Sequence, residues 1–332
     1  MFADVVIGLQ HGDEAKGKVT HHLCKSGEYT HVLRFNGGCN AGHTIYHEGR
    51  KFVTHHIPAG VFYGIRSIIG SGCVLNKNQF FKEIGELEAG GIKTEGVLFI
   101  AENAHVITDT HLEEDGKDTK IGTTKRGNGP AYRDKYARDG LLAKDVPELQ
   151  GYTVNLYEEF HENEEVKILC EGAQGFELDI DWGDYPFVTS SHCTTAGALL
   201  NGIPPAWVRQ VWGVGKVYET YVGAKTFEPP SSIFPKLREL GEEYGATTGR
   251  PRQCNWLDLD RLTRALKVNG VTHLVLNKVD VIRQLGINQL FSDGESKVFS
   301  SPEDMLTHIA EHLEANLPTS VEIFFSESKN HI

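Results

Sequence analysis

The sequence has few of the features that mark a membrane protein or a secreted protein. No run of eighteen apolar residues occurs among its 332 residues, so we expect no membrane-spanning helix. The chain starts directly with a strand-like apolar segment, which predicts that no signal peptide is present. Its six cysteines are scattered and form no C-x-x-C pair, which indicates reduced thiols rather than disulfides or a zinc site. These absences predict a soluble, cytoplasmic protein.

Positive charge is also scarce. The chain has 33 Lys and Arg against 45 Asp and Glu, a formal net charge of −12. Proteins that bind nucleic acid generally carry a basic field, so we expect no nucleic-acid partner. A local basic site for a phosphate is compatible with this charge. The length is sufficient for a large hydrophobic core.

Short apolar runs alternate with helical patterns along the chain. The runs are Val5–Gly8, His31–Phe35, Ser67–Gly70, Gly96–Ala101, Val166–Cys170, Val211–Val217, His273–Leu276 and Ser320–Phe325. Helical patterns such as Asn78–Ala89 and Asp258–Asn269 lie between them. This alternation predicts an α/β fold with a mostly parallel central sheet, in one large domain over residues 1–332. The polar segments Asp109–Pro130 and Ala224–Gly249 are long for connections, and we expect functional loops there.

The first eighteen residues carry the clearest chemical signal. A strand over Val5–Gly8 leads into Gly12–Lys18, which fits G-x-x-x-x-G-K and opens a helix. This arrangement predicts a phosphate site made of backbone N–H groups and a helix N-terminus. Val19 follows where a Ser or Thr would hold Mg²⁺. Because a carboxylate in a phosphate loop repels the ligand unless it binds a metal or takes a proton, Asp13 is a candidate for one of these roles.

Two further glycine-rich stretches follow predicted strands. Asn36–Thr44 comes after a strand and presents His43 at its tip, where it forms a candidate acid/base and metal pair with Asp13. The alternative is a glycine-rich turn with a chance histidine. The stretch Ile121–Tyr132, with Arg138 beyond it, combines Thr hydroxyls, Gly amides and Arg side chains that suit a monophosphate. The alternative there is a polar surface loop.

Three stretches in the second half of the chain complete the candidate site. Glu171–Gly175 is a turn at a strand end that offers an amide side chain to a ligand. Tyr244–Arg252 places Arg250 and Arg252 in a Gly/Thr loop suited to carboxylates, although solvated charge is the commoner fate of such a pair. Asn277–Asp280 has the form N-K-x-D, in which the Asp can accept hydrogen bonds from guanine.

Taken together, these stretches resemble the adenylosuccinate synthetase family. The similar segments keep the family's order over residues 5 to about 280 and are Gln10–Lys18, Asn40–Thr44, Gly122–Tyr132, Glu171–Gly175, Tyr185–Ser191, Gly245–Arg252 and Trp256–Asp258. The resemblance implies an enzyme that joins L-aspartate to C6 of IMP with GTP and Mg²⁺. It also implies a homodimer, because Arg138 is similar to an arginine that reaches a neighbouring subunit's phosphate.

The resemblance also implies a role for each matching residue. Asp13 would take the N1 proton and bind Mg²⁺ with the Gly42 carbonyl, His43 would stabilise the moving phosphoryl group, and Gln174 would hold Asp13 and the base. The phosphates of the donor nucleotide would contact Gly12, Glu14, Ala15, Lys16, Gly17 and Lys18. The purine nucleotide would contact Asn40, Thr124, Arg138, Gln174 and Thr189. The aspartate would contact Thr247, Thr248, Arg250 and Arg252, and the guanine of GTP would contact Lys278 and Asp280.

The sequence departs from the family's pattern at several positions. His11 stands in place of the usual Trp, Ala15 and Lys125 stand in place of Gly, and His192-Cys193 interrupts a Ser/Thr stretch. The segment Phe325–Lys329 lacks the usual Thr-Gly-Pro, which leaves ATP as an alternative donor. GMP or dGMP, the substrate of a phage-type relative, is an alternative to IMP, and the retained Asp13 favours IMP. A GTP-binding switch protein is an alternative of another class.

Overall fold

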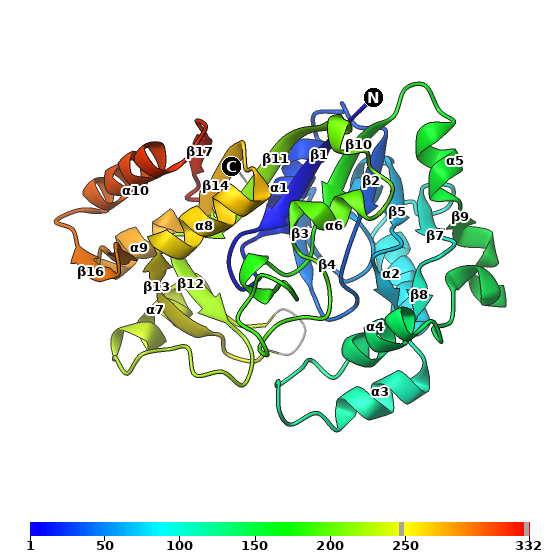
Figure 1. Ribbon diagram of the computed structural model, residues 1–332, viewed down its shortest axis with the longest axis horizontal. Helices are drawn as coiled ribbons and strands as arrows, with labels where there is room; N and C mark the ends of the chain where they lie inside the picture. Colours follow the sequence, from blue (N-terminus) through cyan, green and yellow to red (C-terminus); the bar gives the residue numbers. More distant parts are fainter. Residues whose placement is uncertain (246–248, 329–331) are drawn as a thin grey trace.

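The computed structural model describes residues 1–245, 249–328 and 332. Its centre is a nine-stranded sheet in the order β17-β14-β11-β1-β10-β2-β5-β7-β9, in which every neighbouring pair runs parallel (Figure 1). The strands are β1 (Phe2–Gly8), β2 (His31–Arg34), β5 (Arg66–Ile69), β7 (Leu98–Ala101), β9 (Thr153–Val154), β10 (Lys167–Glu171), β11 (Val208–Lys216), β14 (His273–Asn277) and β17 (Glu322–Phe325). The expected α/β fold with a parallel central sheet is therefore confirmed.

Smaller sheets flank this centre. A second sheet has the order β12-β13-β15-β16 and combines antiparallel and parallel pairs. Its strands are β12 (Tyr218–Tyr221), β13 (Gln253–Asp258), β15 (Gln289–Ser292) and β16 (Glu295–Val298). Two short two-stranded sheets join β3 (His43–His47) with β4 (Arg50–Thr54), and β6 (Val74–Leu75) with β8 (His105–Val106). Because β12 follows β11 almost directly, the second sheet extends from the carboxyl edge of the central one.

Helices cover both faces of the central sheet (Figure 1). The α-helices are α1 (Lys16–Cys24), α2 (Lys77–Ala89), α3 (Asp109–Gly116), α4 (Asn128–Ala137), α5 (Leu156–His161), α6 (Thr195–Leu199), α7 (Ile233–Gly241), α8 (Leu259–Asn269), α9 (Val279–Leu285) and α10 (Pro302–Asn316). The 3₁₀ turns are η1 (Ala59–Tyr63), η2 (Ala143–Asp145), η3 (Pro147–Tyr152), η4 (Phe176–Leu178) and η5 (Pro205–Trp207).

Alternation along β1 shows how the two layers are built. Val5 and Ile7 belong to the core cluster that includes residues of α6 and α8, whereas Val6 packs in a second cluster with Val19 of α1. Successive side chains of a strand point to opposite faces, so α1 lies on one face and α6 and α8 lie on the other. A strand covered on both sides is apolar throughout, which is why β1 appears in the sequence as a continuous run.

The two segments expected to be long loops contain helices. α3 and the start of α4 lie within Asp109–Pro130, and α7 lies within Ala224–Gly249. The reading of these segments as loops alone is therefore wrong, and the helices shorten the true connections. Among the described residues, no helix combines the length and the apolar character needed to cross a membrane. All six cysteines are free and buried.

Candidate active site

The candidate site lies at the carboxyl edge of the central sheet. β1, β10 and β2 are parallel neighbours, so the loops that leave them emerge on the same edge. These loops carry Asp13, Gln174 and the segment that ends at His43. Ligands of open α/β sheets bind in this position, outside the carboxyl ends of the strands. The three predicted catalytic residues therefore come from loops on one edge.

The phosphate loop connects β1 to α1 through a strained backbone. Gly12, Asp13 and Ala15 have φ angles of 86°, 60° and 73°, which lie in the left-handed region. This region costs energy for residues other than glycine, and such strain concentrates at ligand-binding loops. The loop therefore has the tightly turned backbone that the glycine-rich sequence predicts.

Glu14 is fully buried and bonded within the loop. Its Oε1 accepts the N–H groups of Gln10 at 3.2 Å and Gly12 at 2.8 Å. Its Oε2 accepts a hydrogen bond of 2.6 Å from Lys16 Nζ, and Lys16 also donates to the carbonyl oxygen of Gln174. A buried carboxylate needs such partners. The second acid of the Asp13-Glu14 pair therefore organises the loop from within, and Lys16 joins it to the loop after β10.

Close packing ties the phosphate loop to its neighbours. A Cβ atom on Gly8 would lie 2.5 Å from both the carbonyl oxygen of Gln174 and Oε2 of Glu14. A Cβ atom on Gly17 would lie 3.2 Å from Cβ of His43. The first spacing excludes any side chain at the end of β1, which is a physical reason for glycine there. The second places His43 against the first turn of α1.

Lys18 connects α1 to the predicted guanine site. Its Nζ donates to Asn277 Oδ1, to Ser326 Oγ at 2.7 Å and to the carbonyl oxygen of Ser328 at 3.0 Å. Burial lowers the pKa of Lys18 to about 8, and the nearby Lys278 ammonium contributes. Asn277 Nδ2 in turn donates to the carbonyl oxygen of Glu14 at 2.8 Å. The predicted phosphate and guanine segments are thus joined by direct hydrogen bonds.

His43 is buried as the first residue of β3, and not exposed at the tip of a turn as expected. It is 7% exposed, and burial lowers its pKa to about 4, with the Arg34 guanidinium as the next contribution. Its Nδ1 lies 2.6 Å from Oε1 of Glu171 and 3.2 Å from Nη1 of Arg34. Glu171 was not among the predicted site residues, although it begins one of the stretches that the sequence singles out. The sequence feature that could have identified Glu171 is an acidic residue at the last position of an apolar, buried strand.

Gln174 and Asn40 are brought into contact. Gln174 Nε2 donates to Asn40 Oδ1 at 3.1 Å, and Asn128 Nδ2 donates to the same oxygen at 2.8 Å. Asn36 Nδ2 donates to Gln174 Oε1 at 3.5 Å. Gln174 itself has a φ of 58°, in the left-handed region. These amide side chains form a network that joins two loops to the start of α4, and Asn36 and Asn128 were not among the predicted site residues.

The other residues predicted to contact the purine nucleotide lie farther out. Thr124 and Arg138 are exposed, and Thr189 is half-buried with its N–H donating to Leu178 O at 2.8 Å. The loop that carries Thr124 is organised by Asp118, whose carboxylate accepts the N–H groups of residues 120–123. Asp118 is therefore a structural residue of this loop. Arg138 ends α4 in a left-handed conformation, with a φ of 68°.

The predicted aspartate loop contacts the phosphate loop. Arg252 Nε lies 2.9 Å from Oδ2 of Asp13, and Arg252 Nη1 donates to Oε2 of Glu243 at 2.5 Å. Burial alone would raise the pKa of Glu243, but Lys216 and Arg252 outweigh it and lower the pKa to about 2. Tyr218 donates to the same carboxylate at 2.6 Å. Glu243 is therefore an ionised, buried anchor for Arg252.

The other residues predicted to contact the aspartate and the guanine have different surroundings. Arg250 is exposed, and its Nη2 donates to Gly223 O at 3.4 Å. Thr247 and Thr248 lie outside the described residues. Lys278 Nζ donates to Gly241 O at 2.6 Å, and Asp280 lies in the first turn of α9.

The described residues include clustered side chains that could hold a metal ion, besides the predicted ligands Asp13 and Gly42. Within residues 1–245, 249–328 and 332, two sets of side chains have ligand atoms within 4.8 Å of one another: His11, Glu177 and Asp184, and Asp179, Asp181 and His192. In the first set Arg261 forms ion pairs with both carboxylates. The side chain of Asp13 is 36% exposed. Its carboxylate and the Gly42 carbonyl are oxygen donors of the kind that Mg²⁺ prefers. The predicted residues therefore fit Mg²⁺ in chemical type.

Comparison with known proteins points to one family. The model of the adenylosuccinate synthetase family matches residues 5–163 and 147–291. The adenylosuccinate synthetase of Halothermothrix orenii is 40% identical over 336 residues, covering 85% of this chain and 78% of that protein. The adenylosuccinate synthetase of Cytophaga hutchinsonii is 38% identical over 367 residues, covering 93% of this chain and 85% of that protein.

Solved structures give the same result. The fully ligated adenylosuccinate synthetase from Plasmodium falciparum matches with a TM-score of 0.87 and 28% identity, covering 98% of this chain and 97% of that chain. The succinoaminodeoxyadenylate synthetase of cyanophage S-2L, solved with dGMP and with dATP as an energy donor, matches with a TM-score of 0.76. Its identity is 23%, and the match covers 95% of this chain and 90% of that one, so this second likeness supports the fold alone.

Proposed function

The chain belongs to the adenylosuccinate synthetase family and is a ligase, and we propose that it joins L-aspartate to C6 of IMP with the hydrolysis of GTP. One observation carries this proposal. Asp13, expected to act on the purine, is in contact with Arg252, expected to hold the aspartate, at the carboxyl edge of the sheet. A GTP-binding switch protein would have no use for this pair.

The proposed first step activates the purine. Asp13 takes the proton from N1, and O6 of IMP attacks the γ-phosphorus of GTP. The bond from that phosphorus to the β,γ-bridging oxygen breaks, so that GDP leaves and 6-phosphoryl-IMP forms. His43 stabilises the charge on the moving phosphoryl group, which is an electrostatic and positioning task. Gln174 holds the base, an assignment supported by its contact with Asn40 at 3.1 Å.

The proposed second step forms the carbon–nitrogen bond. The aspartate amine attacks C6, the C6–O6 bond breaks, and phosphate leaves while the nitrogen loses a proton. Arg250 and Arg252, with Thr247 and Thr248, hold the two carboxylates of the aspartate. Planar guanidinium groups suit this task because they bind carboxylates through paired hydrogen bonds. The product is adenylosuccinate.

We propose that Mg²⁺ is the cofactor and that the Asp13 carboxylate and the Gly42 carbonyl would hold it. When bound, it neutralises negative charge on the phosphates. The loop N–H groups, Lys16 and the N-terminus of α1 hold the rest of the triphosphate. Support comes from the chemical type of the donors and from the partial exposure of the Asp13 side chain.

The donor and the assembly are part of the same proposal. Asp280 and Lys278 read the guanine. This assignment is supported by Asn277, which donates a hydrogen bond to the carbonyl oxygen of Glu14 and accepts one from Lys18, so that the segment before Lys278 is bonded to the phosphate loop and α1. Arg138 is exposed at the end of α4, where it is free to reach a second copy of the chain in a homodimer. The six free, buried cysteines support a reducing, cytoplasmic location.

A phosphate-release assay tests the substrates directly. Purified protein with Mg²⁺ and L-aspartate receives IMP, GMP or dGMP, each with GTP and with ATP, and the product mass is measured. We expect turnover with IMP and GTP. Turnover with dGMP alone would replace the proposal with the synthesis of a 2-aminoadenine precursor, and GTP hydrolysis that needs neither aspartate nor purine would support the switch protein. Sedimentation of the same sample tests the homodimer.

A further inference from the structure

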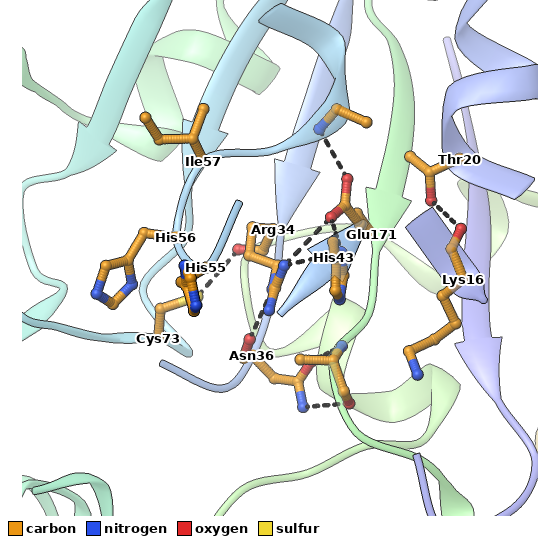
Figure 2. Close-up of polar contacts among 12 residues, drawn as sticks. Lys16, Thr20, Arg34, Asn36, His43, His55, His56, Ile57, Cys73 and Glu171 are labelled. Carbon is orange, nitrogen blue, oxygen red and sulfur yellow. Dashed lines mark hydrogen bonds and ion pairs between the residues drawn. The ribbon is translucent and has the colours of Figure 1, made fainter. Parts of the chain in front are cut away.

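Glu171, His43 and Arg34 form a buried polar group at the ends of β10 and β2. They are 0%, 7% and 1% exposed. Oε1 of Glu171 lies 2.6 Å from Nδ1 of His43 and 3.2 Å from Nη1 of Arg34, and Oε2 accepts the N–H of Ala59 at 2.9 Å. Figure 2 shows the Glu171 carboxylate with dashed bonds to His43 and Arg34. Both oxygens of the carboxylate are therefore satisfied, as burial requires.

The chemistry of the three groups determines which atom of His43 carries a proton. Burial would raise the pKa of Glu171, but His43 outweighs it with help from Arg34, so the pKa is lowered and the carboxylate only accepts. A guanidinium only donates. Nδ1 lies closer to the carboxylate than to Arg34, so the contact of 2.6 Å has a donor and an acceptor only when Nδ1 is protonated. Arg34 then donates to Glu171, and Nε2 is the ring nitrogen left for a ligand.

Glu83 offers a comparison, because it is another buried glutamate and its partners are structural. Glu83 is 1% exposed and accepts the N–H groups of residues 55–57. It also lies 3.4 Å from Nδ1 of His55, outside the candidate site. Glu171 differs from it in its contact with Arg34 and in the position of its histidine. Its histidine packs against the first turn of α1, where a Cβ atom on Gly17 would lie 3.2 Å from Cβ of His43.

We propose that Glu171 is a positioning residue for His43, holding the ring by Nδ1–H so that Nε2 faces the phosphoryl group in transfer. This proposal rests on the proposed function, in which His43 stabilises that group. A carboxylate behind a functional histidine fixes the ring's orientation and the position of its proton. Arg34 balances the charge of Glu171, so the carboxylate stays ionised without drawing the proton away from Nδ1.

Kinetics of three variants test the proposal. Glu171→Gln keeps the size of the side chain and removes its charge, and we expect kcat to fall about 100-fold while KM for IMP and GTP changes less than about threefold. Glu171→Asp keeps the charge, so its kcat should be at least about tenfold higher than that of Glu171→Gln. Glu83→Gln is the matched control, a buried glutamate outside the site, and should retain kcat within about threefold. Equal losses in Glu171→Gln and Glu83→Gln would overturn the proposal.

A spectroscopic measurement separates this proposal from the proposed function. The ¹⁵N shifts of the His43 ring, assigned by their loss in His43→Asn, should show a protonated Nδ1 in the native chain. The Nδ1-protonated fraction should fall in Glu171→Gln and stay unchanged in Glu83→Gln. A native ring protonated at Nε2 alone would overturn the positioning role even if the ligase is active. If the chain shows no ligase activity, the proposed function fails, and the phosphoryl-facing role of Nε2 fails with it.

Discussion

The side chain of Arg252 bridges two carboxylates that come from different loops. Its Nε lies 2.9 Å from Oδ2 of Asp13, and its Nη1 donates to Glu243 at 2.5 Å. Glu243 is buried and fixes one end of the guanidinium, whereas the side chain of Asp13 is 36% exposed. The residue expected to bind the aspartate is thereby held next to the residue expected to act on the purine.

Asp13→Asn should abolish turnover while nucleotide binding stays measurable. The amide cannot take the N1 proton, so O6 is not activated for attack on the phosphorus. We expect kcat to fall at least about 1000-fold, with the dissociation constant for GTP changed by less than about tenfold. Turnover is measured by phosphate release and binding by calorimetry. Retained activity in Asp13→Asn would show that another group is the base.

Arg252→Lys should weaken aspartate binding. A lysine ammonium cannot contact Glu243 and a substrate carboxylate with the same planar geometry. We expect KM for aspartate to rise about 10- to 100-fold, with KM for IMP and GTP nearly unchanged. Arg66→Lys is the matched control, because Arg66 begins β5, at the opposite edge of the sheet from the site, and forms an ion pair with Glu159. A rise in KM for GTP instead would place Arg252 at the phosphates.

Asp280→Asn should change which nucleoside triphosphate the protein prefers as phosphoryl donor. An aspartate accepts two N–H groups from guanine, whereas an asparagine presents one donor and one acceptor, which complements xanthine. We expect KM for GTP to rise at least about tenfold and KM for XTP to fall below that of the native chain. Asp293→Asn, a change at an exposed loop residue paired with Lys297, is the control. Unchanged preference in Asp280→Asn would remove Asp280 from the guanine site.

Protonation of His56 should lower the free energy of unfolding of the chain in mild acid. Its Nε2 accepts the N–H of Asn76 at 3.1 Å, and burial lowers its pKa to about 4. The unfolded chain takes up a proton near pH 6.5, and the folded chain does so only near pH 4. Stability therefore falls as the pH drops through this window, by on the order of 3 kcal/mol from this residue.

Urea unfolding between pH 7 and pH 4 measures this contribution. His56→Gln keeps an acceptor for the N–H of Asn76 without a titrating group, so its stability should depend less on pH than that of the native chain. His161→Gln, a change at an exposed histidine that bonds Gly202 O, should leave the dependence unchanged. Parallel curves for the native chain and His56→Gln would contradict this assignment.

The central sheet is predictable because both of its faces are covered. Each buried strand is then a nearly continuous apolar run, and the eight expected runs correspond to β1, β2, β5, β7, β10, β11, β14 and β17. β9 spans only Thr153–Val154, which is too short to give such a run. The second sheet is not predictable in this way. β12 is buried but includes Glu219 and Thr220, and β16 is largely exposed, so neither gives a separate apolar run.

The candidate site is predictable at strand ends and unpredictable in its pairings. Asp13, His43 and Gln174 follow strands, and the rule for parallel sheets assigns them to one edge. Their partners depend on the order of strands in space, which apolar periodicity does not reveal. Glu171 is 128 positions from His43 in the sequence and directly bonded to it. The burial of His43 has the same origin, because α1 packs over it.

Asn277 links two segments of the nucleotide site, so that thermal fluctuations should open both segments together. Its amide donates to the carbonyl oxygen of Glu14 and accepts from Lys18, so one side chain joins the loop after β1 to the end of β14. The loop cannot detach from the sheet edge without breaking the bonds at the other segment. The two segments, 263 positions apart, should therefore open as one cooperative unit. Amide protons in both should exchange with deuterium at a common rate, which GTP slows in both together.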